Sequence, residues 1–390
     1  MTTAADLAVP SPTPPPAQPM GRGDHRGSWV PTGGMIATRI MELRKRRGLM
    51  IALVVVNIGI PTIFLLVRLL AHAFDPKSYG PAGGYSIYTG LVAGVMYVFG
   101  FIVAATLGCT AGSVDLGEGM FRHLVVTGRS RLSLYLARIP AGLAIIVPLV
   151  AVGFAIVCAV CVFAAPATLN YDGVNIPPSL SLKAFESWAA DHPTTVVCDF
   201  DYNGPLPANV PCGPNGPTVI KGPGPSGNAA PLPPSHAALR ADAVKIAKFN
   251  YNAYSETFRV PSDSLMIDSG LWLELEAAIG FVVGLGLASL LGQRTVAVIL
   301  MIVLEVILTP IASMARIPHL VNLQRAIVGL ATAHLEPGGL PSVFGGGGGP
   351  GQPGASNLLP ETTTEAVFVV VAWIVVWTAL GAWRMMTRDA

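Results

Sequence analysis

The sequence predicts an all-α polytopic membrane protein, that is, a chain whose helices cross the bilayer several times. Hydrophobic residues make up 52% of the chain and charged residues only 12%, whereas an ordinary soluble domain carries about a quarter charged residues. Apolar runs of about twenty residues recur along the chain, and each can cross about 30 Å of hydrocarbon as a helix. Basic residues flank alternate ends of these runs, and one orientation of the chain in the membrane places all of those ends in the cytoplasm.

The N-terminal part divides into a tail and a basic segment. Residues 1–34 are Pro-rich and polar, so we expect a disordered cytoplasmic tail. Residues 35–48 carry Ile36, Ile40 and Leu43 on one helical face, together with five basic residues. This pattern predicts an amphipathic helix on the cytoplasmic surface of the membrane. The alternative is that the basic run is only the positively charged flank of the first span.

The remaining chain, residues 35–390, is predicted to form one transmembrane domain with six spans and both termini in the cytoplasm. The spans are expected at residues 49–71, 85–111, 139–165, 271–292, 295–314 and 366–383. Only Gln293 and Arg294 separate the fourth span from the fifth, which predicts a tight helical hairpin that turns on the cytoplasmic side.

Two long loops are predicted to lie outside the cytoplasm, at residues 166–270 and 315–365. The first contains Cys198 and Cys212, and an oxidising compartment would permit a disulfide between them. Such a bridge closes a loop of about fifteen residues and stabilises it by about 3 kcal/mol in the chain-entropy model. The alternative is two free thiols. Residues 237–258 have the pattern of an amphipathic helix.

Small residues recur at every fourth position in two of the spans. The second span carries Gly100, Ala104, Gly108 and Gly112, and the fourth carries Gly280, Gly284, Ala288 and Gly292. Such stripes let helix backbones approach closely in lipid. They indicate either packing within the chain or an interface with a second copy.

Glu305 is the most unusual residue within a span, because an ionisable side chain near mid-membrane is costly and must face protein or water. Asn57 in the first span is a candidate hydrogen-bond partner, and together they are candidates for a translocation path. The alternative for Glu305 is a purely structural acid. Glu274 and Glu276 open the fourth span, so we expect them at the outer rim of the membrane.

The sequence contains no pattern that indicates catalysis. The phosphate-binding pattern G-x-x-x-x-G-K-[ST] is absent, as are H-E-x-x-H and G-x-S-x-G. The His residues are scattered, and no Cys and His residues have the spacing of metal ligands. We therefore expect no enzyme activity, no cofactor and no metal in this chain.

The stretch between the second and third spans, residues 112–138, has a pattern that can be compared with a family. It resembles the corresponding cytoplasmic loop of ABC-2 type permeases, the membrane subunits of ATP-binding cassette exporters. The matching positions are Asp115, Glu118, Gly119, Arg122, Leu124, Gly128, Ser130, Arg131 and Arg138. Met120 stands where the family usually has Thr, and Arg138 where Lys is common. The basic segment before the first span is similar to the family's elbow helix.

The resemblance implies a transporter driven by a separate cytoplasmic ATPase subunit. Residues 115–126 would form a coupling helix that docks on that subunit, with Asp115, Glu118, Gly119, Met120, Phe121, Arg122 and Leu124 as its contact residues. The working unit would pair two permeases, as a homodimer or a heterodimer, in the plasma membrane of a bacterium. Export rather than import follows from the family alone.

Three alternatives remain at this point. The loop can be a solvated basic turn without a partner. The chain can be a non-transporting signalling or assembly protein whose external loop binds a ligand. An intramembrane enzyme is the third, although no catalytic set supports it. No feature indicates a nucleic-acid partner, and none identifies the substrate.

Overall fold

We analysed the chain in a computed structural model. It describes residues 30–75, 79, 81–117, 130–166, 169–171, 174–200, 235–314, 319–338, 340 and 361–387. In these ranges the regular structure is helical apart from one short hairpin, in which β1 (Leu169–Tyr171) pairs antiparallel with β2 (Val174–Ile176). The prediction of a helical protein is therefore confirmed at this level.

Six helices in the described part of the chain are long and apolar enough to cross a membrane, which makes the protein compatible with a multi-pass membrane protein. They span Arg47–Phe74, Tyr85–Ser113, Arg131–Phe163, Asp263–Leu291, Arg294–Ser313 and Thr363–Thr387. Each contains most of the span predicted at its place in the sequence. The prediction of six apolar helices is thus confirmed, whereas their orientation stays a prediction.

Three of these long helices contain a π-helical turn. The first consists of α2 (Arg47–Val54), η1 (Val55–Gly59) and α3 (Ile60–Phe74). The second consists of α5 (Tyr85–Gly90), η2 (Leu91–Met96) and α6 (Tyr97–Gly117), and the fifth of α14 (Arg294–Ile302), η3 (Val303–Leu308) and α15 (Thr309–Met314). π-Helical turns are rare and are frequent at functional sites. Asn57 lies in η1 and Glu305 in η3.

The third helix is made of α8 (Arg131–Leu136) and α9 (Arg138–Phe163), and the fourth and sixth are α13 (Asp263–Leu291) and α18 (Thr363–Thr387). Ser130 caps α8, because its hydroxyl accepts a hydrogen bond from the Ser133 amide at 3.2 Å. Gly292 ends α13 in the left-handed conformation, with φ of 73°. Because α14 begins only two residues later, the predicted hairpin between the fourth and fifth helices is present.

The helices α6 and α13 form the centre of the bundle, and the two stripes of small residues meet there. A Cβ atom added to Gly108 would lie 2.1 Å from the carbonyl oxygen of Phe281. One added to Gly284 would lie 2.7 Å from the carbonyl oxygen of Ala105. Backbones this close require residues without a side chain. The stripes therefore serve packing within the chain.

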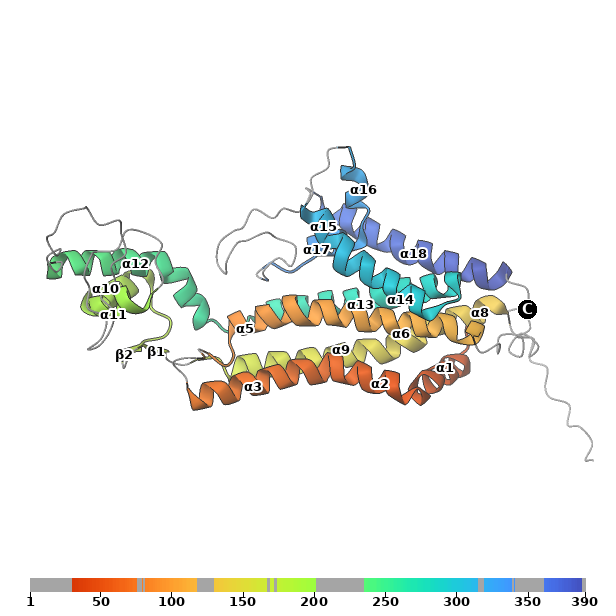
Figure 1. The fold of residues 1–390 in the computed structure, drawn as a ribbon, viewed down its shortest axis with the longest axis horizontal. Coiled ribbons are helices and arrows are strands. Elements are labelled where there is room, and N and C mark those ends of the chain that lie inside the picture. The colour runs from red at the N-terminus through yellow and green to blue at the C-terminus, as the bar shows by residue number, and fades with distance from the viewer. Residues whose placement is uncertain are drawn as a thin grey trace, which may run out of the picture.

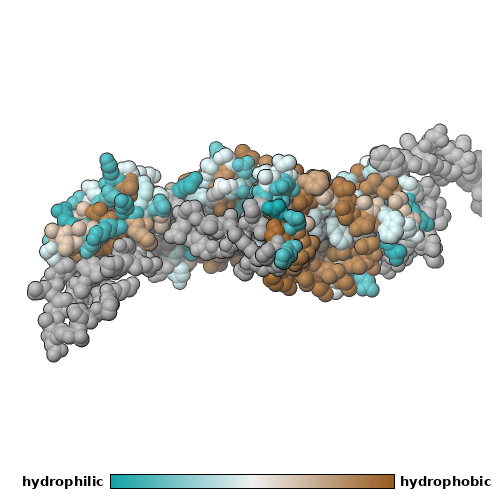
Figure 2. All heavy atoms as spheres, turned by 90° about the horizontal axis from the view of Figure 1, so that it is seen from above, coloured by the Kyte–Doolittle hydropathy of each residue, from teal (hydrophilic) through white to brown (hydrophobic). Residues whose placement is uncertain are grey.

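The two ends of the molecule differ in structure (Figure 1). At one end lies α1 (Gly33–Lys45), beside α8 and the C-terminal end of the chain. At the opposite end lies a separate group of helices, α10 (Leu182–Asp191), α11 (Pro193–Asp199) and α12 (His236–Thr257). Figure 2 shows hydrophobic side chains in brown gathered over the long helices, whereas the group at the far end mixes teal, white and brown.

This group of helices, which we call the outer domain, falls within the loop predicted at residues 166–270 and has an aromatic core of its own. Phe185 is fully buried and stacks on Tyr254, with 4.0 Å between ring centroids. The Tyr251 hydroxyl donates to the carbonyl of Leu180 at 3.1 Å, which ties α12 to the chain before α10. Helix α12 occupies the predicted helical segment at 237–258.

The loop predicted at residues 315–365 also contains helices. Helix α16 (Val321–Arg325) is followed by α17 (Val328–His334), whose residues from Val328 to Ala333 are all buried. The indole nitrogen of Trp373 in α18 donates to the carbonyl of Ala326 at 2.7 Å. Part of this predicted loop is therefore packed into the bundle.

Candidate functional site

The predicted coupling residues lie mostly outside the described residues. Glu118, Gly119, Met120, Phe121, Arg122 and Leu124 belong to the range 118–129, which is not described. Asp115 falls in the last turns of α6, where only the backbone is described. The described structure therefore bears on the two flanks of this segment, the end of α6 and the beginning of α8.

A shared acceptor joins three helices next to the end of α6. The Arg138 guanidinium donates to the carbonyl oxygen of Gly112 at 3.3 Å, and the Ser289 hydroxyl donates to the same oxygen at 3.4 Å. Arg138 begins α9 and is only 2% exposed, while Ser289 belongs to α13 and is fully buried. We call this contact the Gly112 joint. It connects α6 with α9 and with the central helix α13.

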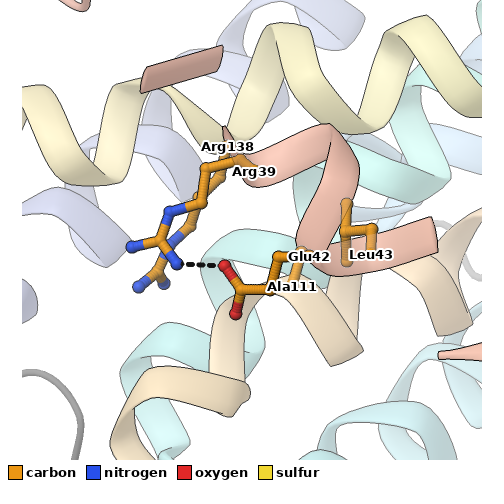
Figure 3. A pocket seen from close by; sticks show the side chains of 5 residues that line it. All are labelled: Arg39, Glu42, Leu43, Ala111 and Arg138. Carbon is orange, nitrogen blue, oxygen red and sulfur yellow. Dashed lines mark hydrogen bonds and ion pairs between the residues drawn. The ribbon is translucent and has the colours of Figure 1, made fainter. Parts of the chain in front are cut away.

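Helix α1 packs against this joint. Arg39 and Leu43 lie on its buried face, and the Arg39 guanidinium forms an ion pair with Glu42, one turn along the helix (Figure 3). Together with Ala111 and Arg138 they line a small pocket of about 10 Å³, which is room for about one water molecule. A buried guanidinium needs such a partner. The basic residues of this segment were expected only to supply charge, whereas Arg39 is buried on the same face as Met35 and Leu43.

Arg46 separates α1 from α2 because its ψ of 71° departs from helical values. The two helices consequently run in different directions (Figure 1). Met35 of α1 packs with Leu134 and Ala137, at the start of the third long helix. A helix that leaves the bundle direction here has the arrangement of a surface helix, although its contact with a membrane stays a prediction.

The C-terminal helix reaches the same end of the bundle. The Arg131 guanidinium of α8 donates to the carbonyl of Met386 in α18 at 3.2 Å. Contacts at Gly112, Arg131 and Arg138 therefore bring α6, α8, α9, α13 and α18 together at this end of the bundle.

The second group of predicted residues, Glu305 and Asn57, lies within the bundle. Both are buried, with 5% and 4% of their surface exposed. No hydrogen bond joins them in the described structure. The hydroxyl of Tyr97 donates to Glu305 Oε1 at 2.9 Å, and the Asn57 amide donates to the carbonyl of Leu53 at 3.0 Å. The structure thus pairs Glu305 with α6 and leaves Asn57 bonded to its own helix.

A buried acid that the sequence analysis placed at the membrane rim accompanies Glu305. Glu276 is only 2% exposed, so it is packed inside the bundle and is not a solvated carboxylate at the rim. The fourth helix begins at Asp263 instead of about residue 271. Glu276 therefore lies 13 residues inside the helix, or about 20 Å from its start. Ser262 is the sequence signal that could have shown this early start. It caps the helix, because its hydroxyl accepts a hydrogen bond from the Leu265 amide at 3.3 Å.

The cysteines and the possible metal ligands are the remaining groups for which the sequence made a prediction. Cys198 is disulfide-bonded, and Cys212 lies outside the described residues. Cys109, Cys158 and Cys161 are free thiols. Over the described ranges, no three His, Cys, Asp or Glu side chains gather in a way that could hold a metal ion.

Comparison with other proteins identifies no relative of this chain. It matches none of the protein-family models, curated proteins or solved structures with which it was compared.

Proposed function

We propose that this chain is the permease subunit of an ATP-binding cassette exporter of the ABC-2 type. It moves a substrate across the plasma membrane of a bacterium, works as a pair with a second permease, and receives its energy from a separate ATPase subunit. The proposal rests on the loop pattern at Asp115 to Arg138, and the six apolar helices are compatible with it.

The Gly112 joint supports the proposal from the side of the structure. A coupling segment must pass a displacement of the ATPase to the helices that line the path. Residues 118–129 lie between α6 and α8 in the chain, and near them Arg138 of α9 and Ser289 of α13 both donate to the carbonyl oxygen of Gly112 in α6. A push on this segment therefore acts on α6, α9 and α13 together.

Close packing allows this displacement to travel as a rigid movement. The α6 and α13 backbones are in direct contact at Gly108 and Gly284, so neither helix can tilt without the other. Interfaces packed in this way have discrete arrangements and are not continuously deformable. The transporter alternates between inward-open and outward-open arrangements as the two permeases move against each other.

The test is association with an ATPase. The full chain, tagged and purified in mild detergent from its own host, should recover an ATP-hydrolysing subunit. Phe121→Asp and Arg122→Glu should each abolish this recovery, because they change the apolar anchor and the charge of the proposed coupling helix. Arg129→Glu is the matched control, since it changes a similar charge beyond that helix and should leave recovery unchanged.

Two results would overturn the proposal. One is that no ATP-hydrolysing subunit accompanies the wild-type chain. The other is that both variants bind the subunit and support transport as well as the control does. Circular dichroism and gel filtration of each variant distinguish lost docking from lost folding.

The outer domain favours a second candidate function, a membrane receptor or assembly protein without transport. Its core of Phe185, Trp188, Tyr251 and Tyr254 gives it a framework independent of the long helices. In that case removal of residues 169–258 abolishes function, whereas the coupling variants have no effect.

A further inference from the structure

Two buried glutamates lie near each other at the centre of the bundle, where four helical elements meet. Glu276 belongs to α13 and Glu305 to η3, and their carboxyl groups interact electrostatically. Tyr97 of α6 interacts with both carboxyls and donates its hydroxyl proton to Glu305. Gly329 of α17 brings its backbone against the Glu305 carboxyl: a Cβ atom there would lie 2.6 Å and 2.7 Å from the two oxygens.

Trp272 holds this arrangement together. Its ring stacks on Tyr97 at a centroid distance of 4.8 Å, with 5° between the ring planes. Its indole nitrogen donates to the carbonyl of Thr332 in α17 at 3.0 Å. The hydrogen bonds and the ring contact therefore connect α6, α13, η3 and α17 in one network, which holds Glu305 in place, and Glu276 lies one helical turn beyond Trp272 in α13.

Each carboxyl group has one oxygen that the network leaves unused. Within the described structure, Oε1 of Glu276 and Oε2 of Glu305 are buried and have no hydrogen-bond partner. Neither carboxyl forms an ion pair with a described Lys, Arg or His. Two carboxylates in such a place cannot both be ionised, because like charges repel strongly in a low-dielectric interior.

The hydrogen bonds that neighbouring side chains offer to Glu276 and to Glu305 differ. The hydroxyl of Thr332 lies beside Glu276, but its proton is donated to the carbonyl of Gly329 at 3.1 Å. The Thr332 hydroxyl is therefore shared, while Glu276 is 2% exposed and its Oε1 has no partner in the described structure, so burial favours the neutral form of Glu276. Glu305 instead accepts a proton from Tyr97 in a hydrogen bond, and this bond stabilises its carboxylate form.

We propose that Glu276 and Glu305 form a proton-binding site within the membrane, in which Glu276 keeps its proton and Glu305 takes up and releases one. In the step itself, a proton from water adds to Oε2 of Glu305 and converts the carboxylate to the neutral acid. No electron is transferred. The hydrogen bond from Tyr97 is retained with the neutral acid as a weaker one.

An open cleft on α13 reaches Trp272, which neighbours this site, although neither glutamate lines it. The cleft has a volume of about 370 Å³ and is lined by Asp268, Leu271, Trp272, Leu275, Leu335 and Pro337. Asp268, Trp272 and Glu276 are spaced four residues apart and therefore lie on one face of the helix. Trp272 thus lies between the exposed carboxyl group of Asp268 and the two buried glutamates.

The close approach of Gly329 and the stacked rings of Tyr97 and Trp272 leave little room around the carboxyls, which favours a proton over a larger cation as the ligand. The titratable groups facing the pair are Tyr97 from α6 and the two acids themselves, and the other neighbours are Thr309, Thr332 and the Gly329 backbone. Uptake of the proton removes the one negative charge of this network.

Infrared difference spectroscopy tests the proposal on the full chain in lipid nanodiscs, without any ATPase. The carboxylic acid C=O band should gain intensity as the pH falls between about 9 and 5. Glu305→Gln should remove this pH-dependent band from the difference spectrum, and Glu276→Gln should remove a carboxylic acid band from the absolute spectrum at every pH. Glu274→Gln is the matched control, because Glu274 is a half-buried acid on the same helix and should leave both bands unchanged.

Tyr97→Phe keeps the test decisive if a glutamine variant does not fold. Loss of the Tyr97 hydrogen bond should raise the pH midpoint of the band by about one to two units. The proposal is overturned if the carboxylic acid band is constant over the whole pH range, which would mean two permanently structural acids. It is equally overturned if the pH-dependent band is the same with and without Glu305→Gln in a Glu361→Gln background, which removes the other acid with a raised pKa, or if its midpoint is the same in Tyr97→Phe. Because no ATPase is present, this result is independent of the proposed function.

Discussion

Replacing Gly108 by alanine should separate α6 from α13, the two helices at the centre of the bundle. The added Cβ atom would lie 2.1 Å from the carbonyl oxygen of Phe281 and 2.9 Å from the amide nitrogen of Leu285. Both atoms belong to the backbone of α13. No side-chain rotation can therefore relieve the overlap, and the helices must move apart.

The magnitude follows from two opposing terms. Alanine is favoured over glycine within a helix by about 1 kcal/mol. An extra methyl group in a close-packed interior typically costs about 1–3 kcal/mol, and occasionally more. Non-bonded carbon atoms prefer separations of about 3.5–4.0 Å, so a contact of 2.1 Å places Gly108 at the upper end of that cost. We expect a net loss of about 2 kcal/mol in the free energy of unfolding.

Denaturant unfolding of the purified chain in mild detergent measures this loss as a lower midpoint. Gly100→Ala is the matched control, because Gly100 belongs to the same stripe of α6 and an added Cβ atom would meet its nearest atom, Asn57 Oδ1, only at 4.0 Å. The control should be neutral or slightly stabilising. If both variants unfold at the wild-type midpoint, the two stripes do not hold the bundle together, and an interface with a second copy becomes the better explanation.

Three further predictions concern other parts of the structure. Phe185→Ala should destabilise the outer domain by about 3–5 kcal/mol and accelerate its proteolysis. Phe249→Ala should have neither effect, because the side chain of Phe249 is 56% exposed. Equal cleavage of both variants would refute the aromatic core. Arg138→Met should lower the free energy of unfolding by about 1.5–3 kcal/mol through loss of the bond to Gly112. The same change at the more exposed Arg131 should cost clearly less, and equal costs would argue against the Gly112 joint. Burial and the nearby Glu365 raise the pKa of Glu361, so the folded state binds this proton more tightly than the unfolded chain. Stability should therefore fall as the pH rises from the ordinary carboxyl range through the raised value, and Glu361→Gln should flatten that slope in pH-dependent thermal melts; an unchanged slope would assign it to other groups.

Much of the helical framework was predictable from local sequence. Whether twenty residues cross a membrane depends on their summed hydropathy, and all six predicted spans are long apolar helices. The hairpin at Gln293 was predictable for a similar reason, since so short a connection leaves neighbouring helices no other path. The helix at 237–258 followed from its own periodicity. The burial of Arg39 was not predictable, because it depends on packing against Arg138 and Ala111, far away in the sequence.

The candidate sites show the same division. The six apolar helices, the stripes of small residues and the unusual position of Glu305 can be read from local sequence, because each depends on residues that are neighbours along one helix. The packing of the helices was needed to show that the two stripes face each other, that Gly112 joins three helices, and that Glu276 accompanies Glu305. The physical reason is separation along the chain: Tyr97 and Glu305 are 208 residues apart. Their contact exists only because α6, α13, η3 and α17 pack around one buried point.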